Sequence, residues 1–279
     1  MDNLDVNIYL ERKERYSNDF LNVLIKLKRS KDIRSQSWGL SVINRYNMFG
    51  NLDLFLNCIY ESKKYFYKST KLTIEIFKIF KENRYPNLEK KEPLPFTAMF
   101  INSFLDAILC DSEEMLLEYA RTIHDDGNTD PPFNYEITSS MKYLILKDYN
   151  KAIVHANNAH QQKYFKLPYK GFSHVVKGIL DRDINLINEG LELRIRYHRR
   201  ENKDSIFYAI SLEATALAKL AIMYDLQPDT SSPFIHNELL KEHKDIQYDG
   251  IDEILEALEV ANRRNGNLLG KIRNKFRKN

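Results

Sequence analysis

Three stretches of this sequence share one pattern and decide the fold: FLDAILCDSEEMLLEYA (residues 104–120), KYLILKDYNKAIVHANNA (residues 142–159) and VVKGILDRDINLINEGLE (residues 175–192). In each stretch, an apolar helical run ends near an aspartate and a second amphipathic run begins after it. The three residues are Asp111, Asp148 and Asp183, which lie 37 and 35 residues apart. Aspartate is a favoured N-cap, because its carboxylate accepts hydrogen bonds from backbone N–H groups of the first helical turn. We therefore expect a helical hairpin around each aspartate, at a period typical of tetratricopeptide-like repeats.

Helical periodicity also runs through the rest of the chain. Residues 51–81 carry apolar side chains at three- and four-residue steps, which predicts one long helix with a bend near Lys63 and Ser69. The chain has 9 glycines and 8 prolines, too few for the many tight turns of a β-sandwich, a barrel or a Rossmann fold. No segment alternates with a period of two residues. The sequence thus predicts an all-α bundle of about eleven to thirteen helices, built from stacked antiparallel helical hairpins and without a sheet.

Prolines mark a candidate domain boundary. Pro86, Pro93 and Pro95 lie in a charged stretch that interrupts the helical pattern. We expect an N-terminal helical lobe over residues 1–90 and a helical-hairpin body over residues 91–279, unless the two form one continuous domain.

The chain has the features of a cytoplasmic protein. The N-terminus has no basic and apolar signal segment, and no run reaches the 18 or so apolar residues that span a bilayer. Cys58 and Cys110 both sit in apolar helical patterns, which predicts two buried thiols in a reducing compartment. We expect no membrane association.

The C-terminal segment is basic. Residues 263–279 hold seven lysines and arginines and no acidic residue, in a chain of net charge +3. The simpler interpretation is a solvated C-terminal helix, and the other is a contact with nucleic acid or membrane. A single aromatic residue, Phe276, stands among these charges, fewer than in many nucleic-acid-binding segments, so the first interpretation is favoured.

No catalytic or metal-binding motif is present. The sequence lacks HExxH, GxSxG, CxxC and GxGxxG patterns, so we expect neither an enzyme nor a cofactor, metal or small-molecule substrate. One acidic residue is out of pattern: Glu213 falls on the apolar stripe of its helix. A carboxylate on a core face needs a partner. Arg194 and His198 on the preceding helix are the candidates, which predicts a buried structural tie between two helices.

Two further stretches resemble a known family. VVKGILDRDINLINEGLELRIRYHRR (residues 175–200) and FYAISLEATALAKLAIMYDLQPDTSSPFIHNELL (residues 207–240) resemble the C-terminal half of immunity protein family 49, helical antitoxins of bacterial polymorphic toxin systems. The matching features are the Arg182-Asp183 helix start, the basic end at residues 198–200, the alanines of residues 214–221, and the Ser232-Pro233-Phe234-Ile235 turn before Leu239-Leu240. The helix around Glu213 and Lys219 is also similar to a second immunity family, which protects against a secreted DNase. The N-terminal 100 residues match only as generic amphipathic helices.

The resemblance implies a function by binding. The protein would bind a cognate toxin domain, for example a nuclease, and block its active site in the producer's cytoplasm. The alternatives are a helical-repeat adaptor or regulator that binds another protein or peptide and, less favoured, a nucleic-acid binder that uses the basic tail.

An acidic, proline-containing loop is the candidate toxin contact. Residues 124–136 break the helical pattern, and an acidic loop could enter the basic cleft of a toxin that acts on nucleic acid. The candidate toxin-binding residues are Asp125, Asp126, Asp130, Phe133, Tyr135 and Glu136. The alternative, which the sequence favours, is a connector whose aromatic side chains pack into the bundle.

Overall fold

The computed structural model describes residues 3–29, 35–81, 97–123, 132–161, 167–203 and 206–252, with 254 and 256. These residues form eleven α-helices and one 3-10 turn (Ile206–Ala209), and no strand, so the predicted all-α class is confirmed for this part of the chain. Contacts divide the chain into two compact units. Unit 1 comprises Met1–Leu88 with Ile246–Asn279, and unit 2 comprises Glu89–Asp245. The lobe over residues 1–90 and the body over residues 91–279 stay a prediction from the sequence.

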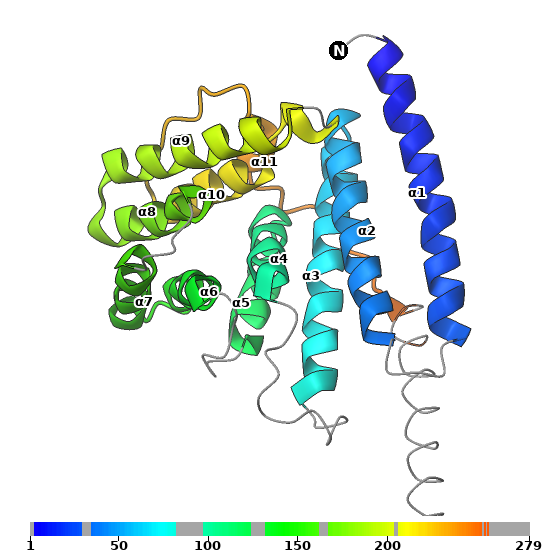
Figure 1. Cartoon of the computed structure of the whole chain (residues 1–279), viewed down its shortest axis with the longest axis horizontal. Helices are drawn as coiled ribbons and strands as arrows, with labels where there is room; N and C mark the ends of the chain where they lie inside the picture. Colours follow the sequence, from blue (N-terminus) through cyan, green and yellow to red (C-terminus); the bar gives the residue numbers. More distant parts are fainter. Residues whose placement is uncertain are drawn as a thin grey trace, which may run out of the picture. The chain divides into compact units, whose positions relative to one another are not determined.

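Unit 1 is built on three long helices, α1 (Asn3–Arg29), α2 (Ser35–Phe55) and α3 (Ile59–Lys81). Helices α2 and α3 lie side by side, and α1 packs on α2 (Figure 1). Tyr9 of α1 stacks on Phe55 with 4.6 Å between ring centroids. The segment after Ile246 returns to α3, where Tyr248 stacks on Tyr67 at 4.3 Å. This return explains why the contacts group the segment with unit 1.

The single helix predicted for residues 51–81 is wrong. The chain turns between α2 and α3 at Asn57, which has a φ of 59°. Asparagine tolerates this left-handed conformation better than most residues. The N–H of Cys58 bonds to the carbonyl of Asp53 at 2.7 Å, which closes the end of α2. Cys58 therefore lies between α2 and α3, directly before Ile59, and is exposed, contrary to the predicted buried thiol, whereas Cys110 is buried as predicted.

Unit 2 contains the other helices. These are α4 (Thr97–Leu109), α5 (Glu113–Thr122), α6 (Pro132–Ile145), α7 (Tyr149–Gln161), α8 (Leu167–Asp181), α9 (Ile184–Glu201), α10 (Leu212–Met223) and α11 (Asn237–Leu240). Helix α6 packs against α7 and α8 against α9, and α10 lies against α4 and α9 (Figure 1). Helices α8 and α9 approach closely at two glycines, because a Cβ on Gly190 would lie 2.7 Å from the carbonyl oxygen of Gly171. Bulkier residues at these positions would force the two helices apart.

The same turn joins α4 to α5, α6 to α7 and α8 to α9. Its first residue is left-handed, with a φ of 60° at Asp111, 61° at Lys147 and 54° at Arg182. The next residue caps the following helix, as Asp183 does by accepting the N–H groups of Asn185 and Leu186. Asp148 likewise accepts the N–H of Lys151 at 3.2 Å.

The predicted capping role is wrong only for Asp111. Ser112 caps α5 by accepting the N–H of Met115, and Asp111 occupies the left-handed position one residue earlier. The equivalent residues of the three turns are therefore Ser112, Asp148 and Asp183, which lie 36 and 35 residues apart. This shift leaves the Asp111 carboxylate available for a contact outside its own hairpin.

Candidate binding pocket

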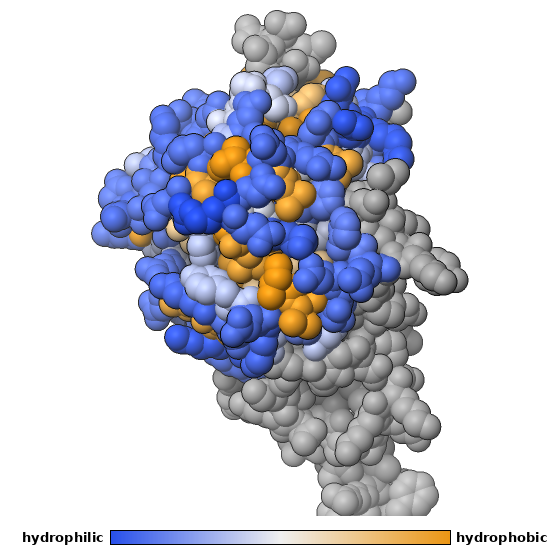
Figure 2. All heavy atoms as spheres, turned by 90° about the vertical axis from the view of Figure 1, so that its left-hand side faces the viewer, coloured by the Kyte–Doolittle hydropathy of each residue, from blue (hydrophilic) through white to orange (hydrophobic). Residues whose placement is uncertain are grey.

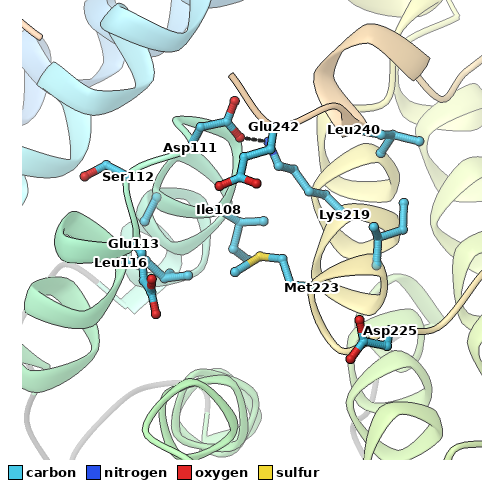
Figure 3. Close-up of a pocket in the computed structure, with 12 residues that line it drawn as sticks. Ile108, Asp111, Ser112, Glu113, Leu116, Lys219, Met223, Asp225, Leu240 and Glu242 are labelled. Atoms are coloured by element: carbon cyan, nitrogen blue, oxygen red, sulfur yellow. Dashed lines mark hydrogen bonds and ion pairs between the residues drawn. The ribbon is translucent and has the colours of Figure 1, made fainter. Parts of the chain in front are cut away.

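A pocket of about 410 Å³ lies in unit 2 between the α4–α5 hairpin on one side and α10 with the chain after α11 on the other (Figure 3). It is lined by Ala107, Ile108, Asp111, Ser112, Glu113, Leu116, Lys219, Ile222, Met223, Asp225, Leu240 and Glu242. Its size falls within the range of about 300–1,000 Å³ that is usual for ligand sites. Three segments that are distant in sequence line the pocket, so its shape depends on the contacts that hold these segments together.

A buried ion pair fastens these segments. Lys219 of α10 bonds to the Asp111 carboxylate, and their side chains are only 5% and 0% exposed. Lys219 Nζ also donates to the carbonyl oxygen of Leu239 at 2.9 Å, and the backbone N–H of His243 donates to Asp111 Oδ2 at 3.0 Å. One ammonium and one carboxylate thus hold the α4–α5 turn, α10 and residues 239–243 together.

The Asp111–Lys219 pair was not among the contacts predicted from the sequence. Lys219 lies in LEATALAKLAIM, where it is the one basic residue of an otherwise mostly apolar helix. A lysine in such surroundings needs a buried acidic partner, and that signal was available in the sequence. Its partner was not, because Asp111 and Lys219 are 108 residues apart.

The remainder of the pocket combines apolar walls with exposed carboxylates. Ile108 and Leu116 are buried, whereas Met223 is 46% exposed, an unusual degree for a large apolar side chain. Figure 3 shows Glu113 on the α5 side and Asp225 at the end of α10, with Glu242 on the chain after α11. All three carboxylate residues are exposed. Such a pocket can take a group that is partly apolar and positively charged.

The predicted tie residues Arg194 and Glu213 form an ion pair between α9 and α10, with their side chains 2% and 33% exposed. The Arg194 guanidinium contacts the rings of both Phe172 and Tyr197, with its Cζ 4.9 Å from each centroid. The buried member of the pair is thus the arginine, and the expectation of a largely buried Glu213 is wrong. The glutamate sits in the first turn of α10, at the margin of the helix contact, where water reaches it.

His198, the third residue considered for the tie, contacts a different element. Its Nε2 lies 2.9 Å from the carbonyl oxygen of Tyr208 in the 3-10 turn. Its ring also packs edge-on against Phe234, with 6.0 Å between centroids. His198 therefore links α9 to the segment before α10, at Tyr208, and to the segment after it, at Phe234. These contacts give it a structural role.

The predicted toxin-binding loop is only partly within the described residues. Asp125, Asp126 and Asp130 lie outside them, as does the side chain of Phe133. Tyr135 and Glu136 belong to α6, so their placement in a loop is wrong. Glu136 Oε2 lies 2.7 Å from Nδ1 of His155 on α7, and the ring of Tyr135 meets that of His155 edge-on at 5.6 Å. These two side chains pack within the α6–α7 hairpin, as the connector alternative implied.

Another face of unit 2 carries exposed apolar side chains. On α7, Tyr149 is 48% and Val154 is 54% exposed. Figure 2 shows a face on which apolar side chains form small groups among hydrophilic ones. Scattered groups of this kind are common on protein surfaces, so they are weaker evidence of a binding site than a pocket is.

Two features are absent from the described residues. No group of three or more histidine, cysteine, aspartate or glutamate side chains is placed to hold a metal ion. No helix in this part of the chain is long and apolar enough to cross a membrane. The basic residues 263–279 lie outside the described part.

Comparison with known proteins found no matching family model, no matching curated protein and no matching solved structure. The resemblance to immunity protein family 49 therefore depends on the quoted residues alone.

Proposed function

We propose that this protein is an immunity protein that binds a cognate toxin domain and neutralises it by covering its active site. The observation that carries the proposal is that the pocket and the family resemblance share residues. Residues 175–240 resemble the immunity family, and Lys219, Met223 and Asp225 in this stretch form one wall of the pocket. Part of the stretch with the family resemblance thus lines a concave surface.

The proposal includes a finer description of the fold. We propose that the α4–α5, α6–α7 and α8–α9 hairpins stack in the manner of tetratricopeptide-like repeats. Support comes from the repeated turn, in which a left-handed residue precedes the capping residues Ser112, Asp148 and Asp183. Stacked hairpins present a rigid, extended surface, which suits recognition of a folded protein.

The test is co-expression with the protein encoded by the adjacent gene. We expect that protein to arrest growth when produced alone in a host cell, and we expect growth to be restored when this chain is produced with it. The two proteins should also co-purify as a stable complex. A neighbouring protein that is harmless by itself, or a toxic one that this chain neither binds nor neutralises, would refute the proposal.

An adaptor that binds another protein or peptide is the second candidate function. It is favoured by the exposed Tyr149 and Val154 on α7, which lie outside the stretch that resembles the immunity family. Replacing both with serine distinguishes the two candidates. Loss of partner binding in this variant, with the pocket unaltered, would favour the adaptor, whereas unchanged binding would favour the pocket.

A further inference from the structure

The side chains that line the pocket carry more negative than positive charge. Lys219 is the one basic residue among the residues that line it, and this lysine is bonded to Asp111 in the interior. The other ionisable side chains of the lining are Glu113, Asp225 and Glu242. The pocket therefore presents three carboxylates to an incoming group, and it can focus their negative field because its walls are partly apolar.

Neighbouring surface charges do not alter this conclusion. Lys244 Nζ lies 3.6 Å from Glu242 Oε2, but the lysine side chain is 81% exposed. An exposed pair of this kind contributes little binding free energy, and a lysine so exposed can leave without a desolvation cost. The carboxylate of Glu242 thus stays accessible to a competing cation.

The apolar walls specify what kind of cation fits. Ile108, Leu116 and Met223 supply apolar side chains to the lining; the first two are buried and Met223 is 46% exposed. A small hydrated metal ion would gain nothing from these side chains. A cation on an aliphatic stem would bury its methylene groups on them while its charged end meets the carboxylates.

Among such groups, arginine fits better than lysine. Its planar guanidinium has five N–H donors and can bond to two carboxylates at once, and it is less strongly hydrated than an ammonium. Arginine is also enriched among the residues that dominate protein–protein binding energies.

We propose that this pocket receives an arginine side chain from the surface of the bound partner protein. The proposal rests on the proposed function, because it assumes that the pocket faces a partner protein. It adds the chemical class of the residue that enters and the three carboxylates that select it.

The probe is N-acetyl-arginine amide, with N-acetyl-citrulline amide as the neutral compound of the same shape. Binding is followed by the NMR signal of the Met223 methyl group, labelled with ¹³C and assigned with Met223→Leu. We expect arginine to shift this signal in a saturable manner at low salt, and citrulline to leave it in place. Equal shifts with both compounds, or no shift with arginine, would overturn the proposal.

The variant with Glu113→Gln, Asp225→Asn and Glu242→Gln tests the carboxylates. We expect it to melt near the wild-type temperature, because all three side chains are exposed, and to bind arginine at least tenfold more weakly. The matched control carries Asp181→Asn, Glu189→Gln and Glu192→Gln, which neutralise three exposed carboxylates on α8 and α9. Equal weakening in the control would show a general charge effect and overturn the proposal.

The same variants separate this proposal from the proposed function. If the pocket variant protects cells and binds the toxin as tightly as the wild type does, the arginine proposal fails and the immunity function stands. If arginine binds as expected but the chain protects against no neighbouring protein, the immunity function fails and the cation preference of the pocket stands.

Discussion

Replacing Asp111 with asparagine removes one negative charge from the interior of unit 2 and changes little else. Asparagine has the same shape as aspartate and tolerates the φ of 60° found at this position. Its side-chain oxygen can still accept the N–H of His243, which lies 3.0 Å from Asp111 Oδ2. The variant therefore isolates the loss of the carboxylate that faces Lys219.

The expected cost is large, because the lysine side chain is only 5% exposed and cannot recover its hydration. Breaking a buried pair by removing one partner costs about 3–5 kcal/mol. The lower end applies here, since Lys219 keeps its 2.9 Å bond to the Leu239 carbonyl. A loss of about 3 kcal/mol lowers Tm by about 6–12 °C for a domain of this size.

The assay is thermal unfolding followed by circular dichroism, and hydrogen exchange of the α10 amides assigns the loss to this part of unit 2. Adding Lys219→Met to Asp111→Asn should restore most of the stability, because it removes the unpaired ammonium and keeps an apolar stem. A single Asp111→Asn variant within about 1 kcal/mol of the wild type would show that the pair does not hold the pocket together, contrary to our reasoning.

Three further predictions concern packing and thiol reactivity. Gly190→Ala should destabilise the chain by about 1–3 kcal/mol in denaturant unfolding, because the added Cβ would lie 2.7 Å from a carbonyl oxygen of α8. A stabilised variant would mean that α8 and α9 separate freely, since alanine gains about 1 kcal/mol in an unobstructed helix. Glu213→Ala should cost about 3 kcal/mol by the same assay, because it removes the carboxylate from the buried Arg194 guanidinium; an unchanged Tm would contradict this. Iodoacetamide should label the native chain once, at exposed Cys58, because Cys110 is buried and its burial raises its pKa to about 12. Mass spectrometry of the labelled chain checks this, and equal labelling of both thiols in the native state would contradict the burial of Cys110.

The turns show how far local sequence could locate the hairpins. Asp148 and Asp183 cap their helices as predicted, because an N-cap is a local feature set by one side chain and the next three residues. The predicted cap of α5, Asp111, was wrong by one residue. Ser112 is an equally good capping residue, and the position of the left-handed turn decides which of the two caps the helix. The same left-handed turn occurs at Asn57 and Cys58. The apolar residues on both sides of it keep a helical spacing, which is why periodicity alone predicted an unbroken helix there.

Sequence by itself determined the all-α class, since a period near 3.6 residues and the scarcity of glycine and proline are properties of the chain read in order. It also indicated that Glu213 needs a partner and that Arg194 could supply it, because both residues lie on adjacent helices. The tertiary structure alone decided that Asp111 faces Lys219, 108 residues away, and that Glu113, Asp225 and Glu242 border one pocket. Burial and charge pairing between distant segments follow from how hairpins pack, and no spacing along the chain encodes them.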